Sequence, residues 1–290
     1  MRALLAPVRE LPQYNEMKTT LAKRAGAIDV TGCVGSQKLN MVYALGDGFR
    51  TRLIITYSDA RCRELCEDYL FYDRNTYIFP AKDMIFYEAD VSGNQIERQR
   101  LMCLRALMEN RPMTMITTWS ALMMPCVCPD IIRDGVVRIS TQMTLDMHAI
   151  TAMLVKLGYE KRDMVENPGE FSVRGGILDI YDITEDNPYR IELWGDEVDS
   201  IRSFDVQTQR SILKTDRISI YPATELVMDA AQLRKGLDRI SKEAQEYSEV
   251  LRSQFRTEEA ARVRKRAAEL REQLLELGLS RGAVNLEGYI

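Results

Sequence analysis

The chain has 290 residues, of which 46% are hydrophobic and 28% are charged, and its formal net charge is −4. This length predicts two or three domains rather than one, and the mild acidity argues against a protein dedicated to binding nucleic acid. No apolar run is long enough to cross a membrane, and the N-terminus lacks the pattern of a secretory signal, so we expect a cytoplasmic protein.

The chain has six cysteines but only one histidine, His148. Cys62 and Cys66 fit one face of a helix, whereas Cys126 and Cys128 are separated by a single residue. Because there is no paired C-x-x-C motif, we expect no zinc site, no other metal and no cofactor. We expect the cysteines to be reduced thiols, most of them buried.

The N-terminal region follows the order of a nucleotide-binding fold. A helix is predicted over 11–25, and a strand over 27–30 is followed by a glycine-containing turn over 32–38. Another helix then begins at Leu39. This order of strand, loop and helix N-terminus is the architecture of a phosphate-binding loop.

The loop departs from the pattern G-x-x-x-x-G-K-[ST] at two positions. Gly32, Gly35 and Lys38 are present, but Gln37 replaces the second glycine and Leu39 replaces the hydroxyl residue. A Cβ at the second glycine obstructs the wrap of backbone amides around phosphates, and leucine cannot bind magnesium. We interpret the loop as a degenerate P-loop; the alternative is a working ATP site.

Further strands and helices alternate after this loop. The predicted strands cover 51–56, 76–79 and 113–117. The predicted helices cover 59–72, with Ser58 as its cap, 94–109 and 119–124. Strands that alternate with helices indicate a parallel α/β sheet, which binds ligands at the carboxyl ends of its strands.

Two other features of this region are candidates for a binding surface. The segment from Pro80 to Asn94 carries Phe86 and Tyr87, and is either a packed connection or a binding loop. A local patch for DNA is the other possibility, formed by Arg61, Arg63, Lys82, Arg98, Arg100 and Arg105.

From residue 136 the pattern changes to that of an α+β domain. Strands are predicted over 136–139 and 217–221, and Thr144 is expected to cap a helix that runs to Leu157 and is followed by Gly158. The side chains expected to face inward from this helix are Leu145, Ala149, Met153 and Leu157.

The centre of this domain is the stretch from Gly169 to Phe204. Residues 171–174 and 177–183 lie on either side of Gly175-Gly176, which we interpret as a bulge in one long strand rather than a hairpin. Residues 189–194 and 198–204 are joined by a tight hairpin turn.

Arg174, Arg190 and Trp194 stand out on this predicted sheet. A tryptophan at a tight turn is often exposed, and an exposed aromatic beside arginines has the composition of a binding hot spot. In the alternative interpretation, Trp194 covers a small core and the arginines pair with neighbouring carboxylates, namely Asp179, Glu192 or Asp199.

From Ala223 to Gly278 the chain is rich in charged residues, alanine and leucine, and its apolar residues recur at helical spacing. The predicted apolar face holds Leu233, Leu237, Ile240, Ala244, Tyr247, Leu251, Ala260, Val263, Ala267, Leu270 and Leu274. The alternating charges indicate a solvated face. The ending VNLEGYI has no obvious terminus, so we expect a longer protein.

Two stretches carry a family resemblance. The runs GEFSVRGGILDIYDI and PYRIELWGDEVDSIRSFDVQTQRS look like the inserted domain of the UvrB family of excinuclease proteins. Together with TGCVGSQKL, YPATE and LEGYI, they resemble still more closely the N-terminal module of the bacterial transcription–repair coupling factors.

The resemblance implies an α/β fold in three parts. Residues 1–135 would form a degenerate P-loop NTPase-like domain with a parallel sheet. Residues 136–222 would form an inserted α+β domain, and residues 223–290 a helical return segment packed on the first domain.

The resemblance also implies a function. In these relatives the inserted domain binds the excinuclease protein UvrA and hands the site of a stalled RNA polymerase to nucleotide excision repair. The family's two binding arginines and its binding aromatic fall on Arg174, Arg190 and Trp194. The C-terminal domains of the same protein would mask this surface, and RNA polymerase and double-stranded DNA would be partners of the intact protein.

The UvrB relatives have an intact P-loop and a hairpin that grips DNA. Here Gln37 and Leu39 break the loop, and residues 81–94 are too few for that hairpin, which favours the coupling factors. We therefore expect no catalytic residue in this chain, and an ATPase motor beyond residue 290. The alternative is a nucleotide-dependent, DNA-binding helicase domain like that of UvrB.

Overall fold

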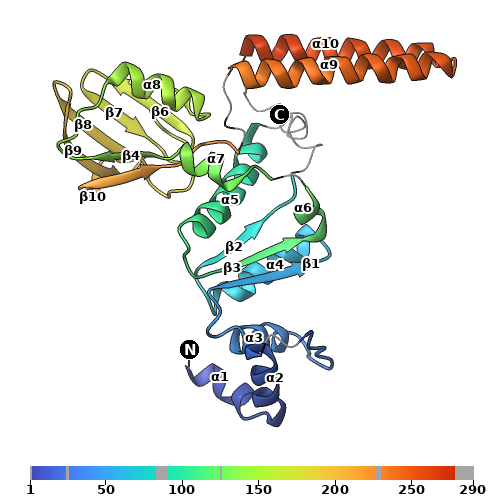
Figure 1. The fold of residues 1–290 in the computed structure, drawn as a ribbon. Helices are drawn as coiled ribbons and strands as arrows, with labels where there is room; N and C mark the ends of the chain where they lie inside the picture. Colours follow the sequence, from blue (N-terminus) through green and yellow to red (C-terminus); the bar gives the residue numbers. More distant parts are fainter. Residues whose placement is uncertain are drawn as a thin grey trace. The chain divides into compact units, whose positions relative to one another are not determined.

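The computed structural model describes residues 2–23, 26–82, 90–124, 126–225, 227 and 230–277. The chain divides into two compact units, one of residues 1–81 with 102–124, the other of residues 82–101 with 125–290. The predicted fold class is confirmed: a parallel sheet, two largely antiparallel sheets and C-terminal helices follow one another along the chain (Figure 1). Among the described residues, no helix is long and apolar enough to cross a membrane. The division at residues 135 and 222 stays a prediction.

The first unit is built on a three-stranded parallel sheet in the order β1-β3-β2. Its strands are β1 (Thr51–Thr56), β2 (Thr76–Phe79) and β3 (Met113–Thr118). Its helices are α1 (Arg2–Arg9), α2 (Pro12–Ala22), α3 (Gln37–Leu45), α4 (Asp59–Leu70) and α6 (Trp119–Met123). Ser58 caps α4 as predicted, because its Oγ accepts the Arg61 N–H at 3.3 Å. Helix α5 (Asp90–Met108) has residues in both units.

The predicted strand over 27–30 is wrong. These residues form irregular chain in the structure, and Val30 is exposed. A short apolar run becomes a strand only where a neighbouring strand pairs with it and its side chains are buried, and neither occurs here among the described residues. The helix after the loop is confirmed and begins at Gln37, whereas α1 was not predicted.

The second unit contains a six-stranded sheet in the order β10-β9-β8-β7-β6-β5 and a two-stranded sheet of β11 and β4. The strands of the larger sheet are β5 (Glu160–Lys161), β6 (Glu170–Arg174), β7 (Ile177–Ile180), β8 (Tyr189–Trp194), β9 (Glu197–Phe204) and β10 (Ser211–Thr215). The smaller sheet pairs β4 (Val137–Ser140) with β11 (Arg217–Ile220). The short helices are α7 (Pro129–Asp134) and α8 (Met147–Lys156). The core contains Ile150, Leu154, Leu178, Ile191 and Ile201.

The bulge predicted at Gly175-Gly176 is wrong, because this pair forms the turn of a hairpin. Strands β6 and β7 are antiparallel, and Arg174 lies opposite Ile177. Gly175 has a φ of +61°, a left-handed conformation that glycine adopts without a steric penalty. The chain therefore reverses between Arg174 and Ile177.

The predicted start of α8 is also wrong. Asp146, not Thr144, caps the helix, and its Oδ1 accepts the N–H groups of His148 at 2.8 Å and Ala149 at 3.3 Å. The predicted inward face is wrong as well: Ile150 and Leu154 are the buried residues of this helix, whereas Ala149 and Met153 are exposed. Gly158 follows the helix with a φ of +88°, in keeping with its predicted role.

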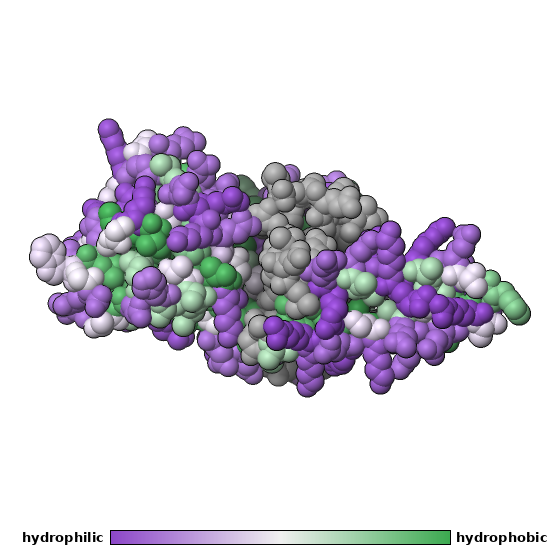
Figure 2. All heavy atoms as spheres, turned by 90° about the horizontal axis from the view of Figure 1, so that it is seen from above, coloured by the Kyte–Doolittle hydropathy of each residue, from purple (hydrophilic) through white to green (hydrophobic). Residues whose placement is uncertain are grey.

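The C-terminal region forms two long helices, α9 (Ala230–Ser253) and α10 (Thr257–Leu277), which pack against each other. Leu237, Leu251 and Ala260 are buried as predicted, but Tyr247 is exposed. Hydrophilic side chains gather along this helical pair in Figure 2, which fits the predicted solvated face. The Leu274 side chain lies outside the described residues.

Candidate protein-interaction site

Arg174, Arg190 and Trp194 lie on one face of the six-stranded sheet. Alternate residues of a strand share a face, so Arg190 and Trp194 of β8 point to the same side. Arg190 lies opposite Asp179 of β7, and Ile177 lies opposite both Arg174 and Glu192. The register therefore places all three predicted residues on the side opposite the apolar core.

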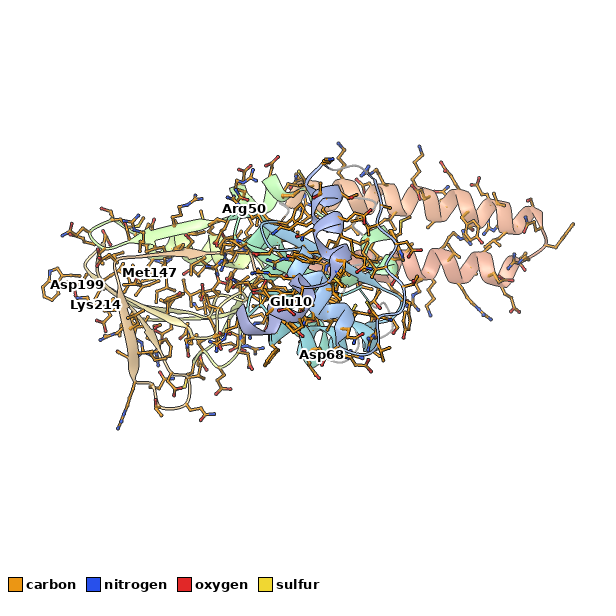
Figure 3. All side chains as sticks on the ribbon, turned by 90° about the horizontal axis from the view of Figure 1, so that it is seen from below. Glu10, Arg50, Asp68, Met147, Asp199 and Lys214 are labelled. Atoms are coloured by element: carbon orange, nitrogen blue, oxygen red, sulfur yellow. The ribbon has the colours of Figure 1, made fainter. Side chains whose placement is uncertain are left out.

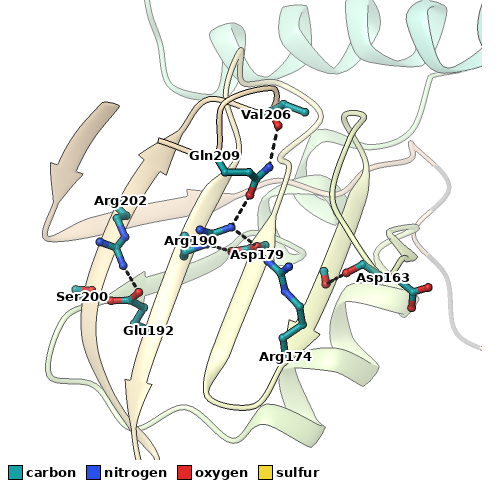
Figure 4. A network of polar contacts seen from close by, with 10 residues as sticks. Asp163, Arg174, Asp179, Arg190, Glu192, Ser200, Arg202, Val206 and Gln209 are labelled. Atoms are coloured by element: carbon teal, nitrogen blue, oxygen red, sulfur yellow. Dashed lines mark hydrogen bonds and ion pairs between the residues drawn. The ribbon is translucent and has the colours of Figure 1, made fainter. Parts of the chain in front are cut away.

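The Asp179 carboxylate joins the two arginines (Figure 4). Arg174 donates from Nη2 to Oδ2 at 2.6 Å, and Arg190 donates from Nε to Oδ1 at 2.7 Å and from Nη2 to Oδ2 at 2.8 Å. The Asp179 side chain is only 2% exposed. Two charge-assisted bonds from one guanidinium to one carboxylate form the bidentate geometry that fixes an arginine most firmly.

Arg190 is fixed from two further directions. Its Nη2 also donates to Gln209 Oε1 at 2.9 Å, and its guanidinium carbon lies 4.4 Å from the centroid of the Phe204 ring. The hydrogen bonds to Asp179 raise the pKa of Arg190 above its ordinary value. Gln209 is itself held, because its Nε2 donates to the Val206 carbonyl at 2.8 Å.

Arg174 and Trp194 are the accessible members of the site. The Arg174 side chain is 44% exposed, against 17% for that of Arg190. Trp194 is 86% exposed and precedes Gly195, whose φ of +62° makes the tight turn. Trp194 therefore covers no core, whereas the arginines do pair with Asp179, one of the carboxylates in the alternative interpretation.

A second ion pair lies on the same face. Arg202 pairs with Glu192, and the Ser200 hydroxyl donates to Glu192 at 2.9 Å. Sequence reasoning missed these contacts and those of Phe204 and Gln209. These contacts depend on which strands are neighbours in the sheet and on their register. A local sequence pattern predicts neither.

The degenerate P-loop residues lie in the first unit. Gly32 and Gly35 have φ values of +81° and +54°. The Val34 N–H donates to the Gln37 side chain at 3.0 Å, so this loop amide is engaged by the replacing residue itself. Leu39 is buried in the core of the unit, and Lys38 is exposed.

The six basic residues suggested as a DNA patch do not form one open surface. Lys82 and Arg100 are buried and pair with Glu225 at 3.0 and 2.5 Å. Three others pair with carboxylates, as Arg61–Glu64, Arg98–Asp186 and Arg105–Glu109. Phe86 and Tyr87 of the suggested binding loop lie outside the described residues.

Cys62 and Cys66 lie on one face of α4, as predicted, and both are buried. Burial raises the pKa of the Cys62 thiol to about 11 and also raises the pKa of Cys66. Cys126 and Cys128 are exposed.

Residues 137–226, which include the whole Asp179 network, match the UvrB interaction domain family. The chain is 34% identical over 191 residues to the transcription-repair-coupling factor of Bacillus subtilis. These residues are 64% of this chain and 16% of that protein. It is 30% identical over 218 residues to UvrABC system protein B of Thermosipho africanus, covering 75% of this chain and 32% of the relative.

UvrABC system protein B of Pseudomonas syringae pv. syringae is 34% identical over 224 residues, which are 77% of this chain and 33% of that protein. The chain thus spans about a third or less of the curated relatives that it matches. The resemblance drawn from the sequence is confirmed, because the relatives found are a transcription-repair-coupling factor and UvrABC system protein B.

Proposed function

We propose that this chain is a protein-interaction module that recruits the excinuclease protein UvrA in transcription-coupled nucleotide excision repair. The observation that carries the proposal is the exposure of Trp194, at 86%, on the sheet face that also presents Arg174, within the UvrB interaction domain. An accessible tryptophan that shares a surface with an arginine has the usual composition of an interface hot spot.

The same proposal assigns no catalysis to this chain. Gln37 engages a loop amide and Leu39 is buried, so neither residue supplies the phosphate or magnesium contacts of a working P-loop. In this proposal residues 1–135 are a degenerate nucleotide-binding domain, residues 136–222 the UvrA-binding domain and residues 223–290 a return segment. The motor that reaches RNA polymerase and double-stranded DNA in the cytoplasm would then lie beyond residue 290.

Titration calorimetry with purified UvrA tests the proposal. Trp194→Ala should weaken binding by ~1–3 kcal/mol, the usual range for a hot-spot residue. Trp119→Ala is the matched control, because Trp119 is also exposed, at 65%, but lies on α6 of the first unit. Equal affinities for the parent and Trp194→Ala would overturn the site, and absence of binding by the parent would overturn the function.

A further inference from the structure

We infer that Asp179 is the positioning residue of the interaction site, and that it holds Arg174 and Arg190 in the orientation in which they meet an acidic group of the partner. The inference rests on the proposed function. Asp179 has no access to a partner itself, since its side chain is 2% exposed. Its contribution would be made through the two arginines.

The topology makes Asp179 the centre of the site. It lies on β7, between β6, which carries Arg174, and β8, which carries Arg190. Three guanidinium nitrogens from two flanking strands therefore converge on one carboxylate at 2.6–2.8 Å. An arginine on a solvated face samples many rotamers, and a fixed carboxylate beneath it removes that freedom before the partner arrives.

The charges of the cluster indicate what the partner supplies. Two guanidinium groups and one carboxylate leave one net positive charge. Within the described part of the chain, the one side-chain hydrogen bond of Arg174 uses Nη2, so Nε and Nη1 remain as donors. Ile177 lies opposite Arg174 on one side and opposite Glu192 on the other. Trp194 is two residues after Glu192 on the same face, so Arg174 and Trp194 lie at the same end of the sheet. A carboxylate beside an apolar pocket fits these two groups.

Asp179→Asn keeps the shape of the side chain and removes its charge. Binding to purified UvrA is measured for the parent, Asp179→Asn, Arg174→Ala and the double variant. Asp182→Asn is the matched control: Asp182 is another buried aspartate of this domain, and it accepts hydrogen bonds from Thr184 and the Tyr221 N–H. Thermal unfolding followed by circular dichroism shows which variants are folded.

A positioning role predicts coupling. Asp179→Asn should weaken binding roughly tenfold, within the range of a hot-spot loss, whereas Asp182→Asn should lower the melting temperature without changing affinity. In the Arg174→Ala background, Asp179→Asn should cost less than in the parent, because Arg190 is then the one arginine left for Asp179 to position. A general loss of folding would act equally in both backgrounds.

The arginine signals give a second readout. The Arg190 Nε–H, which donates to Asp179, should be slow to exchange with water in nuclear magnetic resonance spectra of the parent and fast in Asp179→Asn. If Asp179→Asn does not fold, Arg190→Gln and Arg190→Gln/Asp179→Asn replace it. Arg190 is absent from both of these variants, so Asp179→Asn removes only the ion pair of Arg174. The double variant should therefore bind UvrA more weakly than Arg190→Gln.

The outcomes separate the two proposals. If Trp194→Ala and Arg174→Ala lose affinity while Asp179→Asn binds like the parent, the positioning role is wrong and the proposed function stands. Equal losses from Asp179→Asn in both backgrounds would also overturn the positioning role. A parent chain that does not bind UvrA would overturn both.

Discussion

Glu225→Gln should destabilise the second unit strongly. The Glu225 carboxylate is buried and accepts from Arg100 Nε at 2.5 Å and Arg100 Nη2 at 3.3 Å, while Lys82 Nζ lies 3.0 Å away. Arg100 is fully buried. The substitution keeps the side-chain shape but removes the negative charge that these two cations share.

The expected cost follows from this arrangement. Removing one partner of a buried ion pair typically costs about 3–5 kcal/mol, because the remaining charge stays away from water. A domain has a total stability of about 5–15 kcal/mol, so the urea midpoint should fall markedly. Unfolding in urea, followed by circular dichroism at pH 7, measures the change.

Glu259→Gln is the control for this experiment. Glu259 pairs with Arg256 at the start of α10, where both side chains are about half exposed, at 49% each. Exposed pairs contribute little, so the midpoint should stay where it is. A loss below about 1 kcal/mol for Glu225→Gln, no greater than the usual value of an exposed pair, would refute the reasoning.

The other predictions concern pH, nucleotide and partner binding. Burial raises the pKa of Glu97 from 4.5 to about 7, so the folded state binds this proton more tightly than the unfolded state. That stabilisation is complete below pH 4.5 and is lost as the pH rises through 7, by up to about 3 kcal/mol. Urea unfolding between pH 5 and 8 should show the fall, Glu97→Gln should flatten it, and an unchanged slope would contradict it. A fluorescent ATP analogue should show no micromolar affinity for the chain; binding that Lys38→Ala abolishes would restore the working-site alternative. Arg174→Ala and Arg190→Ala should each weaken UvrA binding by ~1–3 kcal/mol in calorimetry, and parent-like affinity for both would remove the arginines from the site.

The parts of the fold that the sequence predicts best are those that depend on residues close together in the chain. The serine cap of α4 was confirmed because it depends on neighbouring residues alone. The apolar runs of β1 and β3 were confirmed because each has a strand partner, the two pairing in parallel with each other. The run over 27–30 has a similar composition but forms no strand. Whether a run is paired depends on distant segments, which periodicity does not describe.

The edge strand β10 is the opposite case, a strand that is present in the structure but was not predicted from the sequence. Ser211 to Lys214 are exposed, so burial gives this strand no alternation of apolar and polar residues. It was not predicted, although Lys214, labelled in Figure 3, lies opposite Arg202 of β9. Its pairing is maintained by backbone hydrogen bonds, which carry almost no sequence signal.

The hairpin at Gly175-Gly176 brings Arg174 and Asp179 of the candidate site together. In one continuous strand, Arg174 and Asp179 would be five residues and about 17 Å apart along the strand. In the hairpin the chain reverses, and Arg174 Nη2 lies 2.6 Å from Asp179 Oδ2. Glycine pairs are common to bulges and tight turns, so the sequence pattern favoured the wrong one of the two, and the register that places Arg174 opposite Ile177 corrects it.

That reversal changes the interpretation of the arginines. From the sequence, pairing of the arginines with Asp179 is an alternative to binding, since a paired arginine is usually structural. The geometry joins the two interpretations, because Asp179 is buried while Arg174 remains 44% exposed and Trp194 86% exposed. Arg174 is paired with a buried carboxylate, but part of its side chain stays accessible to solvent. Its orientation is therefore already fixed when a partner arrives, so the ion pair supports the proposed interaction instead of competing with it.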